Sequence, residues 1–415
     1  MDIHGMGSFG KVAKCFSLDH AEMVAIKFLN ADDENISQEV DMLKAISVLD
    51  SDKKNIVKFI DSFKYNHLFC LVFEMLDESI FDLMGKRIWL PLSLNEIRPV
   101  LHQLLVSLEA LKGLGIIHGD LKLDNLMLVN HKDHPFKLRV IDFGLAIPAS
   151  EAEIGHLVQN PLFRAPEVML GLPLTEAVDI WSMGCIMMLL FLVDTPFPFD
   201  CSYGWMENLV DLLGQPADHV LAAGEYSKDF FILDKSGWRL MTREEFTNKS
   251  NEEPETDKSG YISFKKNLKK KRISDKQDKL KFQDKMAFFD LLKCCLKVDP
   301  EQRISPSEAL KHPFITMVHM VDEMETSSYA DTALELMIVS PLDNLDESTF
   351  NTVTSEESTS ISSNTGSAAA ITPVDDDVNK SSHKPFKKKL FQRVKNFFCR
   401  VAKRVVRPFK FCMTK

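Results

Sequence analysis

The architecture of this chain can be inferred outward from residues 118–125, HGDLKLDN. This stretch follows a predicted helix over 93–111, which opens with a capping-box pattern and continues with leucines at helical spacing. Two short predicted strands, 126–129 and 137–141, come after it. Acidic, basic and amide side chains therefore gather in a connection between regular elements, where they are candidates for chemistry.

Two further motifs lie upstream. Residues 5–12, GMGSFGKV, fit the pattern GxGxxGxV, in which glycines let a backbone approach phosphate oxygens, although ordinary turns use glycine too. The motif lies between short predicted strands and not at a strand-to-helix junction, which argues against a dinucleotide-binding Rossmann site. Residues 24–27, VAIK, follow at the interval of a hairpin. An inward Lys27 is costly to bury without a partner, and Glu39, on a predicted helix, could supply one.

Two motifs lie downstream. DFG at 142–144 ends the second of the short strands, and APE stands at 165–167. The five motifs in this order and at these intervals are not expected by chance. Over residues 3–316 the sequence resembles the eukaryotic protein kinases. The resemblance implies an α+β, bilobal protein-kinase fold, with a small antiparallel-sheet lobe with one helix over 1–76 and a larger helical lobe over 77–316.

Shorter stretches indicate a closer family. CLVFEML at 70–76, RAPE at 164–167, LGLP at 170–173 and HPFITMVH at 312–319 resemble the homeodomain-interacting protein kinases of the CMGC group. The extended region near 200–285 fits the insert typical of that group. This resemblance implies protein substrates phosphorylated on Ser or Thr, transcription regulators as candidate partners, and a place in the nucleus and/or cytoplasm.

The resemblance also implies roles for single residues in phosphoryl transfer. Asp120 would accept the proton of the substrate hydroxyl group. Lys122, typical of serine/threonine kinases, would steady the γ-phosphate. Lys27 would hold the α- and β-phosphates of ATP and pair with Glu39. The implied catalytic set is Asp120, Lys122, Lys27 and Glu39.

The resemblance further implies that Asn125 and Asp142 hold Mg²⁺ and that ten residues contact ATP. Those ten are Gly5, Gly7, Gly10, Val12, Ala25, Lys27, Phe73, Glu74, Leu76 and Met127. Ala25 and Met127 would sandwich the adenine, and Phe73 would be a bulky gatekeeper, although apolar residues there also suit a plain core. Glu167 would form a buried ion pair with Arg303.

Several positions depart from the family pattern. Gly119 stands where most kinases have Arg, Leu157 where this family usually has an activating Tyr, and Asn160 where it has a hydroxyl group. The five tyrosines, none of them in the activation segment, are Tyr65, Tyr203, Tyr226, Tyr261 and Tyr329. The sequence also begins at the glycine motif, so we expect most of the first strand to be missing. These departures leave an alternative function: a catalytically weak, pseudokinase-like scaffold that binds partners through the fold and a basic tail.

Charge divides the chain unevenly. The formal net charge is −10, but residues 384–415 hold 12 of the 50 Lys and Arg and no Asp or Glu, which leaves the preceding chain at −22. Residues 322–377 hold 13 acidic and no basic residues. We therefore predict an acidic, Ser/Thr-rich, largely disordered linker over 317–382 and a basic amphipathic tail over 383–415.

The tail fits a membrane surface, nucleic acid or an import receptor, and equally a contact with the acidic body of the chain or simple disorder. A basic cluster at 265–272 is a candidate import signal. The longest apolar run, 185–193, has nine residues, so we expect no transmembrane segment. The eight cysteines form no CxxC pair, and the start shows no secretory pattern, so we expect a reducing compartment and no structural zinc.

Overall fold

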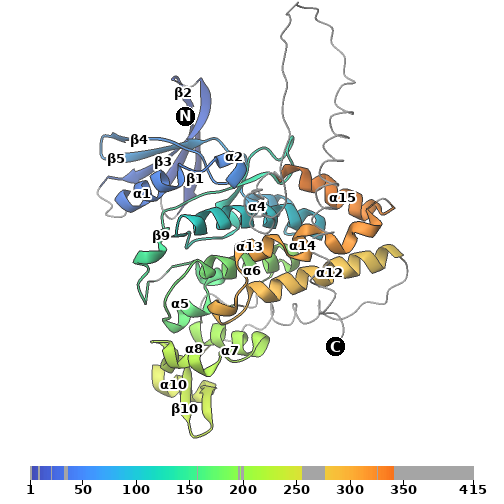
Figure 1. Cartoon of the computed structure of the whole chain (residues 1–415). Helices are drawn as coiled ribbons and strands as arrows, with labels where there is room; N and C mark the ends of the chain where they lie inside the picture. Colours follow the sequence, from blue (N-terminus) through green and yellow to red (C-terminus); the bar gives the residue numbers. More distant parts are fainter. Residues whose placement is uncertain are drawn as a thin grey trace, which may run out of the picture.

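The structure is a computed structural model that describes nine stretches of the chain. They are residues 2–7, 10–19, 21–31, 36–156, 158–194, 197, 201–254, 276–324 and 326–340. A small lobe that carries the main sheet lies at one end, and a larger, mainly helical lobe lies below it (Figure 1). One continuous apolar core extends from the helices of the small lobe through the large lobe.

The small lobe is an antiparallel sheet of five strands in the order β1-β2-β3-β5-β4. Its strands are β1 (Asp2–Gly7), β2 (Gly10–Ser17), β3 (Glu22–Asn30), β4 (Phe59–Tyr65) and β5 (Leu68–Glu74). We expected most of the first strand to be missing, but β1 is a six-residue strand whose Gly7 lies opposite Gly10 of β2. The first residues of the glycine motif therefore lie in β1, and its last residues begin β2.

Two helices accompany the sheet, α1 (Ile36–Ile46) and α2 (Ser51–Lys54). Apolar residues of α1 recur three and four apart, so one face of the helix is buried. Strand β5 is apolar along its length and is paired on both sides, so its centre is buried. The sheet and α1 thus hold VAIK and Glu39 in fixed positions.

The large lobe is organised around α4 (Leu94–Gly113) and α6 (Ala177–Leu192). The capping box predicted for α4 forms, because Ser93 Oγ accepts a hydrogen bond from the Glu96 N–H and the Glu96 carboxylate accepts one from the Ser93 N–H. Around these helices are α3 (Ile80–Lys86), α5 (Pro166–Leu170), α12 (Lys276–Cys295), α13 (Pro306–Leu310) and α14 (Pro313–Thr316). Short strand pairs join β6 (Ile116–Ile117) to β9 (Ile147–Pro148) and β7 (Leu126–Leu128) to β8 (Leu138–Val140).

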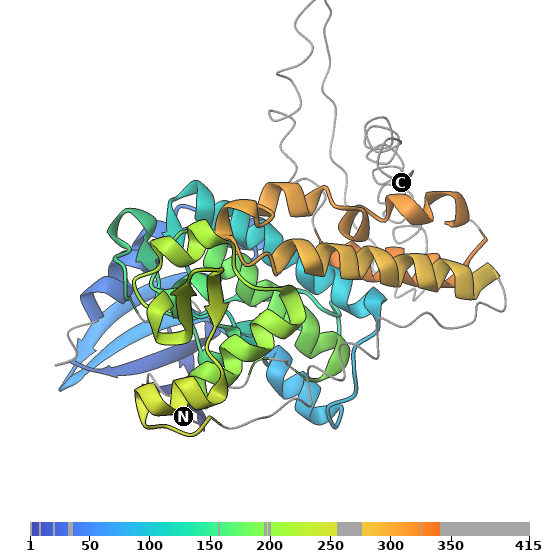
Figure 2. The same ribbon diagram turned by 90° about the horizontal axis from the view of Figure 1, so that it is seen from below.

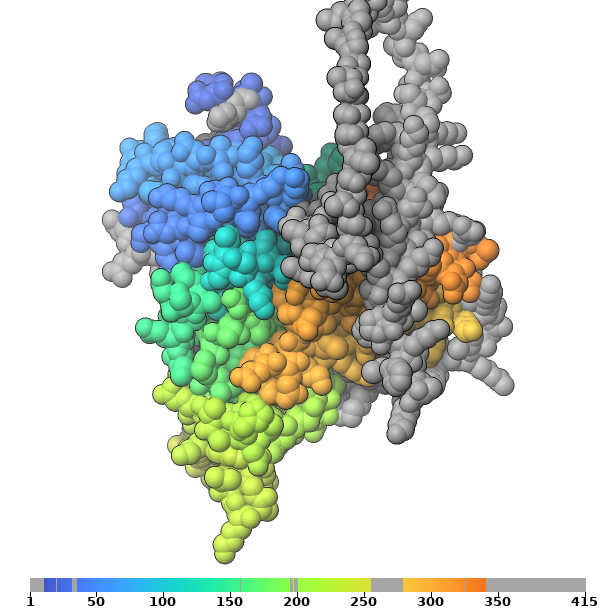
Figure 3. All heavy atoms as spheres, viewed as in Figure 1, coloured from blue at the N-terminus to red at the C-terminus, as the bar shows by residue number. Residues whose placement is uncertain are grey.

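Residues 201–254 form a subregion at the end of the large lobe that lies away from the main sheet, where it protrudes from the surface (Figure 3). Its elements are α7 (Ser202–Leu213), α8 (Asp218–Ala223), α9 (Ser227–Phe230), β10 (Phe231–Asp234), β11 (Gly237–Leu240) and α10 (Arg243–Ser250). It coincides with most of the predicted insert. The basic cluster at 265–272 lies outside the described residues.

The extent of the predicted disordered linker, 317–382, needs correction. Residues 318–340, assigned above to a largely disordered linker, form η5 (Val318–Glu323), α15 (Ser328–Leu336) and η6 (Met337–Val339). This segment lies beside α12 (Figure 2), and Met320, Met324 and Met337 are buried with Leu280 of that helix. The acidic composition of residues 322–377 had led us to overlook the apolar face of this segment. The rest of the predicted linker and the basic tail, residues 341–415, lie outside the described residues.

Candidate active site

An ion-pair cluster lies where the two lobes meet. Lys27, on β3, is 9% exposed, and its Nζ donates hydrogen bonds to Glu39 Oε1 at 2.7 Å and to Asp142 Oδ1 at 2.9 Å. The predicted partner Glu39 is also buried, on the apolar face of α1. The direct contact with Asp142 was not predicted. It joins the VAIK motif of the small lobe to the DFG motif of the large lobe.

Both partners of this second pair keep their charges at neutral pH. Burial alone would lower the pKa of Lys27, but the negative charges of Asp142 and Glu39 outweigh it, and the pKa is raised. Burial alone would raise the pKa of Asp142, but the charge and hydrogen bond of Lys27 outweigh it, and the pKa is lowered. The cluster therefore combines a fixed cation with a carboxylate that stays ionised.

The HGDLKLDN stretch folds around Asp120, which is 3% exposed. Lys122 Nζ donates to Asp120 Oδ2 at 2.6 Å, and Asn125 Nδ2 donates to the same oxygen at 3.0 Å and to the Asp120 carbonyl at 2.8 Å. Asn125 belongs to the short helix η1 (Leu123–Asn125). The three side chains predicted for the catalytic loop are thus brought together by direct hydrogen bonds.

Backbone contacts join this loop to the DFG segment. The Ile141 N–H donates to the Asn125 carbonyl at 3.0 Å, so the residue before Asp142 is held beside Asn125. His118 is fully buried, with Nε2 3.0 Å from the Ile141 carbonyl, and its Nδ1 accepts from the Asp120 N–H at 3.2 Å. His118 therefore supports the backbone on both sides and is not placed as a base.

One supporting residue was missed. Asp179, on α6, is buried, and its two carboxylate oxygens accept the N–H groups of His118 at 2.8 Å and Gly119 at 3.0 Å. Burial raises its pKa. The sequence contained a feature that could have identified it, because Asp179 is the only charged residue in the otherwise apolar sequence of α6. A lone acid in a buried helix indicates a specific partner.

The residues predicted to contact the adenine end of ATP lie on neighbouring strands. Val12 lies opposite Lys27 in the β2–β3 pair, and Ala25 lies opposite Phe73 in the β3–β5 pair. Residues directly opposite each other, and residues two apart on one strand, share a face of a sheet, so all four lie on one face. Leu76 is buried just after β5.

The other residues predicted to contact ATP lie close, in the chain or in the sheet, to the four residues that share this face. Met127 is half-buried on β7 and forms an isolated bridge with Ser79. Gly5 and Gly7 are in β1, and Gly10 begins β2. Glu74 ends β5 at the point where the chain leaves the main sheet for the large lobe.

The segment after DFG is anchored at its end by the predicted ion pair. Arg303 Nη1 and Nη2 donate to the two carboxylate oxygens of Glu167 at 2.6 and 2.8 Å, and both side chains are fully buried. Asn160 Oδ1 accepts the Leu162 N–H at 3.2 Å and so begins a short helical turn. Leu157 lies outside the described residues.

A pocket of about 670 Å³ lies elsewhere in the large lobe, between α8 and the segment around Pro300. Arg303 lines it, but none of the residues implied to act in catalysis, ATP contact or Mg²⁺ binding does, so we do not assign the phosphoryl-transfer chemistry to it. Within the described residues, no helix is long and apolar enough to cross a bilayer.

The residues present fit a hydrated divalent cation. Mg²⁺ in phosphate chemistry is usually held by one or two protein oxygens together with phosphates and water. Asp142 offers an ionised carboxylate, and Asn125 is oriented through its amide nitrogen, which leaves the amide oxygen as a neutral ligand. Elsewhere among the described residues, no group of three or more His, Cys, Asp or Glu could hold a metal ion.

Residues 2–315 match the family model described as "Protein kinase domain". The chain belongs to the protein kinase family. Among similar proteins, homeodomain-interacting protein kinase 2 of Mesocricetus auratus is 36% identical over 338 residues, which are 78% of this chain and 28% of that protein. Homeodomain-interacting protein kinase 1 of Caenorhabditis elegans is 34% identical, over 77% of this chain and 40% of that protein.

Homeodomain-interacting protein kinase 4 of Macaca fascicularis is 32% identical, over 80% of this chain and 57% of that protein. The chain therefore spans less than two thirds of the length of each of these relatives. What the match covers is the protein kinase domain, and the predicted α+β fold with a small antiparallel-sheet lobe and a helical lobe is confirmed.

Proposed function

We propose that this chain is an ATP-dependent serine/threonine protein kinase. One observation carries the proposal: Lys27 is bonded to both Glu39 and Asp142, while Asp120, Lys122 and Asn125 are bonded to one another in the adjoining loop. Phosphoryl transfer requires positioning and charge neutralisation more than covalent chemistry, and these residues provide both.

The proposed roles are those that the family resemblance implies, and the contacts in the structure support them. Lys27 places a positive charge beside Asp142, where the α- and β-phosphates would lie, and Glu39 keeps its ammonium group oriented. Lys122 Nζ lies 2.6 Å from Asp120 Oδ2, so the side chain that would contact the γ-phosphate lies beside the one that would contact the substrate hydroxyl group. Asp120 accepts the proton of that hydroxyl group as the oxygen attacks phosphorus. Mg²⁺ held by Asp142 and Asn125 would neutralise the phosphate oxygens.

The test is transfer of labelled γ-phosphate to a basic protein substrate, compared between the wild type and Asp120→Asn. We expect transfer by the wild type and loss of transfer in the variant. Equal signal from the two would contradict the proposal. Stabilisation of the wild type by Mg-ATP without any transfer would instead favour the scaffold suggested by the departures at Leu157 and Asn160.

We further propose transcription regulators among the protein substrates and a location in the nucleus and/or cytoplasm. The support is that the relatives reported above are named homeodomain-interacting protein kinases. The basic tail adds a candidate contact with a membrane surface, nucleic acid or an import receptor. Imaging the full chain beside one that ends at Asn379, together with liposome and DNA co-sedimentation of both, tests these points.

A further inference from the structure

The carboxylate of Glu74 is held by two parts of the protein at once. Its Oε1 accepts the Lys58 N–H at 2.8 Å and Arg139 Nε at 3.0 Å. The Glu74 N–H also donates to the Lys58 carbonyl at 3.1 Å. Glu74 is the last residue of β5, so the start of the connection to the large lobe is fixed by its side chain as well as by its backbone.

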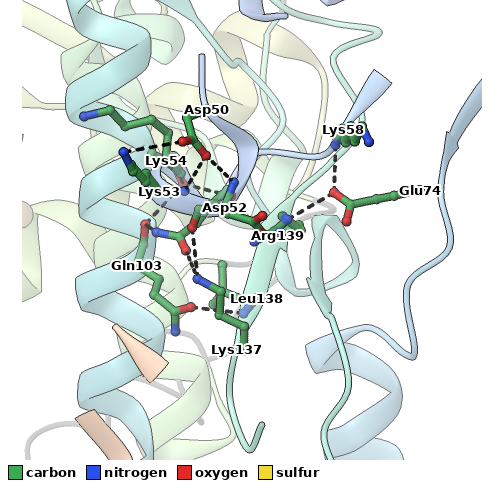
Figure 4. A network of polar contacts seen from close by, with 12 residues as sticks. Asp50, Asp52, Lys53, Lys54, Lys58, Glu74, Gln103, Lys137, Leu138 and Arg139 are labelled. Carbon is green, nitrogen blue, oxygen red and sulfur yellow. Dashed lines mark hydrogen bonds and ion pairs between the residues drawn. The ribbon is translucent and has the colours of Figure 1, made fainter. Parts of the chain in front are cut away.

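Arg139 is the centre of this contact. It lies on β8, three residues before Asp142, and its side chain is 4% exposed. Besides Glu74, its guanidinium group pairs through Nη2 with Asp52 of α2, as Figure 4 shows. One side chain therefore links the strand that leads to Asp142, the start of the connection between the lobes, and the helix that follows α1.

Residues 52–58 belong to the small lobe in sequence but are bonded to the large lobe. The Val140 N–H donates to the Asn55 carbonyl at 2.8 Å, and the Val57 N–H donates to the Val140 carbonyl at 3.0 Å. Ser107 Oγ of α4 donates to the Lys54 carbonyl at 2.8 Å. This segment is therefore attached to β8 and α4, and Arg139 extends the same bonded unit as far as Glu74.

Lys137, the residue just before β8, reinforces the unit. Its Nζ donates to Asn55 Oδ1 at 2.8 Å and to the Asp52 carbonyl at 3.1 Å. Burial, and then the positive charge of Arg139, lower the pKa of Lys137 to about 8. Two cations share this small space, so the carboxylates of Glu74 and Asp52 are needed to balance them, and each acid–base contact depends on the others.

We propose that Arg139 and Glu74 are positioning residues that hold the adenine-binding edge at residues 74–76 in register with Asp142. This rests on the proposed function, because it concerns the same nucleotide site. The Arg139–Glu74 contact is an ion pair that joins the adenine edge to the strand leading to Asp142. Without it, the spacing between that edge and Asp142 would depend on the backbone and on apolar packing such as that of Leu76. We call the Arg139–Glu74 contact the clamp. It is formed in the same structure as the Lys27–Glu39 and Lys27–Asp142 pairs, so it supports the arrangement that binds nucleotide.

The test compares Arg139→Met and Glu74→Gln with a matched control, Lys58→Ala. Lys58 is exposed and contributes only its backbone to the clamp, so its side chain can be removed without breaking the contact. We expect Arg139→Met and Glu74→Gln each to raise the KM for ATP and the Kd of a fluorescent ATP analogue by about tenfold, with kcat changed by less than about twofold. The double variant should be no worse than the more affected single variant.

Arg139→Lys separates positioning from folding. Lysine keeps the charge but cannot bridge Glu74 and Asp52 as the planar guanidinium group does, so we expect an intermediate Kd with nearly wild-type thermal stability. Should Arg139→Met fail to fold, Glu74→Gln and Arg139→Lys decide the question. Unchanged nucleotide Kd in these folded variants, or additive effects in the double variant, would overturn the clamp.

The two proposals fail in distinguishable ways. A wild type that transfers phosphate, with clamp variants that bind ATP as well as it does, refutes the clamp and leaves the kinase activity standing. A wild type that binds the analogue without transferring phosphate, with clamp variants that bind it about tenfold more weakly, refutes the activity and supports the clamp. A wild type that binds no nucleotide refutes both.

Discussion

Tyr329 donates a 2.6 Å hydrogen bond from its hydroxyl group to Asp284 Oδ2, and this bond joins the segment after residue 317 to α12. The other oxygen of Asp284 accepts from Arg98 of α4 and lies 2.9 Å from His319 Nε2. Asn95, also on α4, donates to the Tyr329 carbonyl at 3.0 Å. The segment is therefore held by a buried polar network as well as by its methionines.

Tyr329→Phe should lower the free energy of unfolding. The substitution removes one donor from a buried carboxylate and leaves the ring in place, so we expect a loss of about 1–3 kcal/mol. Urea unfolding followed by circular dichroism measures it. The control is Glu335→Gln, an exposed position on the same helix. A chain ending at residue 316 should lose more, because it also exposes Leu280 of α12, which is buried with Met320 and Met337 in the full chain. Equal stability of Tyr329→Phe and wild type would contradict a tightly docked segment.

The same network predicts the response to acid. Burial tends to raise the pKa of Asp284, but the charge of Arg98 and the contact with His319 outweigh it and lower the pKa to about 2, from 3.8. A carboxylate with a depressed pKa contributes stability that is present above the unfolded value and lost as pH falls through the folded value. We therefore expect about 2 kcal/mol of stability to disappear between pH 4 and pH 2.

Asp284→Asn tests this assignment. The variant should be less stable at neutral pH, because Arg98 is left buried without its counter-charge. Its stability should also fall less steeply below pH 4 than that of the wild type, since the titrating group is gone. Urea unfolding at several values between pH 5 and pH 2 gives both slopes. Parallel slopes would show that Asp284 does not carry the acid response.

The contacts between site residues that are close in the chain were predictable from the sequence. Lys27 and Glu39 stand on a strand and a helix that are close in the chain, so periodicity alone brings them together. The contacts of Asp120, Lys122 and Asn125 fall within six residues. The family resemblance then supplied Asp142, whose bond to Lys27 spans 115 positions and has no local signal.

The missed features depend on long-range pairing. Asp179 meets His118 across 61 positions, and Arg139 meets Glu74 across 65. A charged residue in an apolar stretch indicates that the side chain has a partner, but the sequence does not show which residue that partner is. The start of the disordered linker was misplaced for another reason: counting acidic residues over 322–377 averaged an apolar helical face together with the sequence beyond it. Periodicity, applied to 318–340 alone, would have separated the two.

Lys27→Met tests the ion-pair cluster. Methionine has a similar length but leaves Glu39 and Asp142 without the cation between them, so the pKa of Asp142 should rise and the phosphates should lose their anchor. We expect phosphate transfer to fall by about 100-fold or more. Lys11→Met, an exposed lysine on the neighbouring strand, is the control. Retention of transfer in a folded Lys27→Met protein would remove Lys27 from the mechanism.

Asp179→Asn examines a residue that touches no substrate. The acid accepts two backbone N–H groups of the catalytic loop, whereas asparagine offers one acceptor oxygen and turns an N–H₂ group toward the second donor. Asp120 should then be held less firmly, so we expect kcat to fall by about tenfold or more while the KM for ATP stays within about twofold. Glu176→Gln, just before the same helix, is the control. A rise in KM for ATP with unchanged kcat would mean that Asp179 acts on the nucleotide site and not on the catalytic loop.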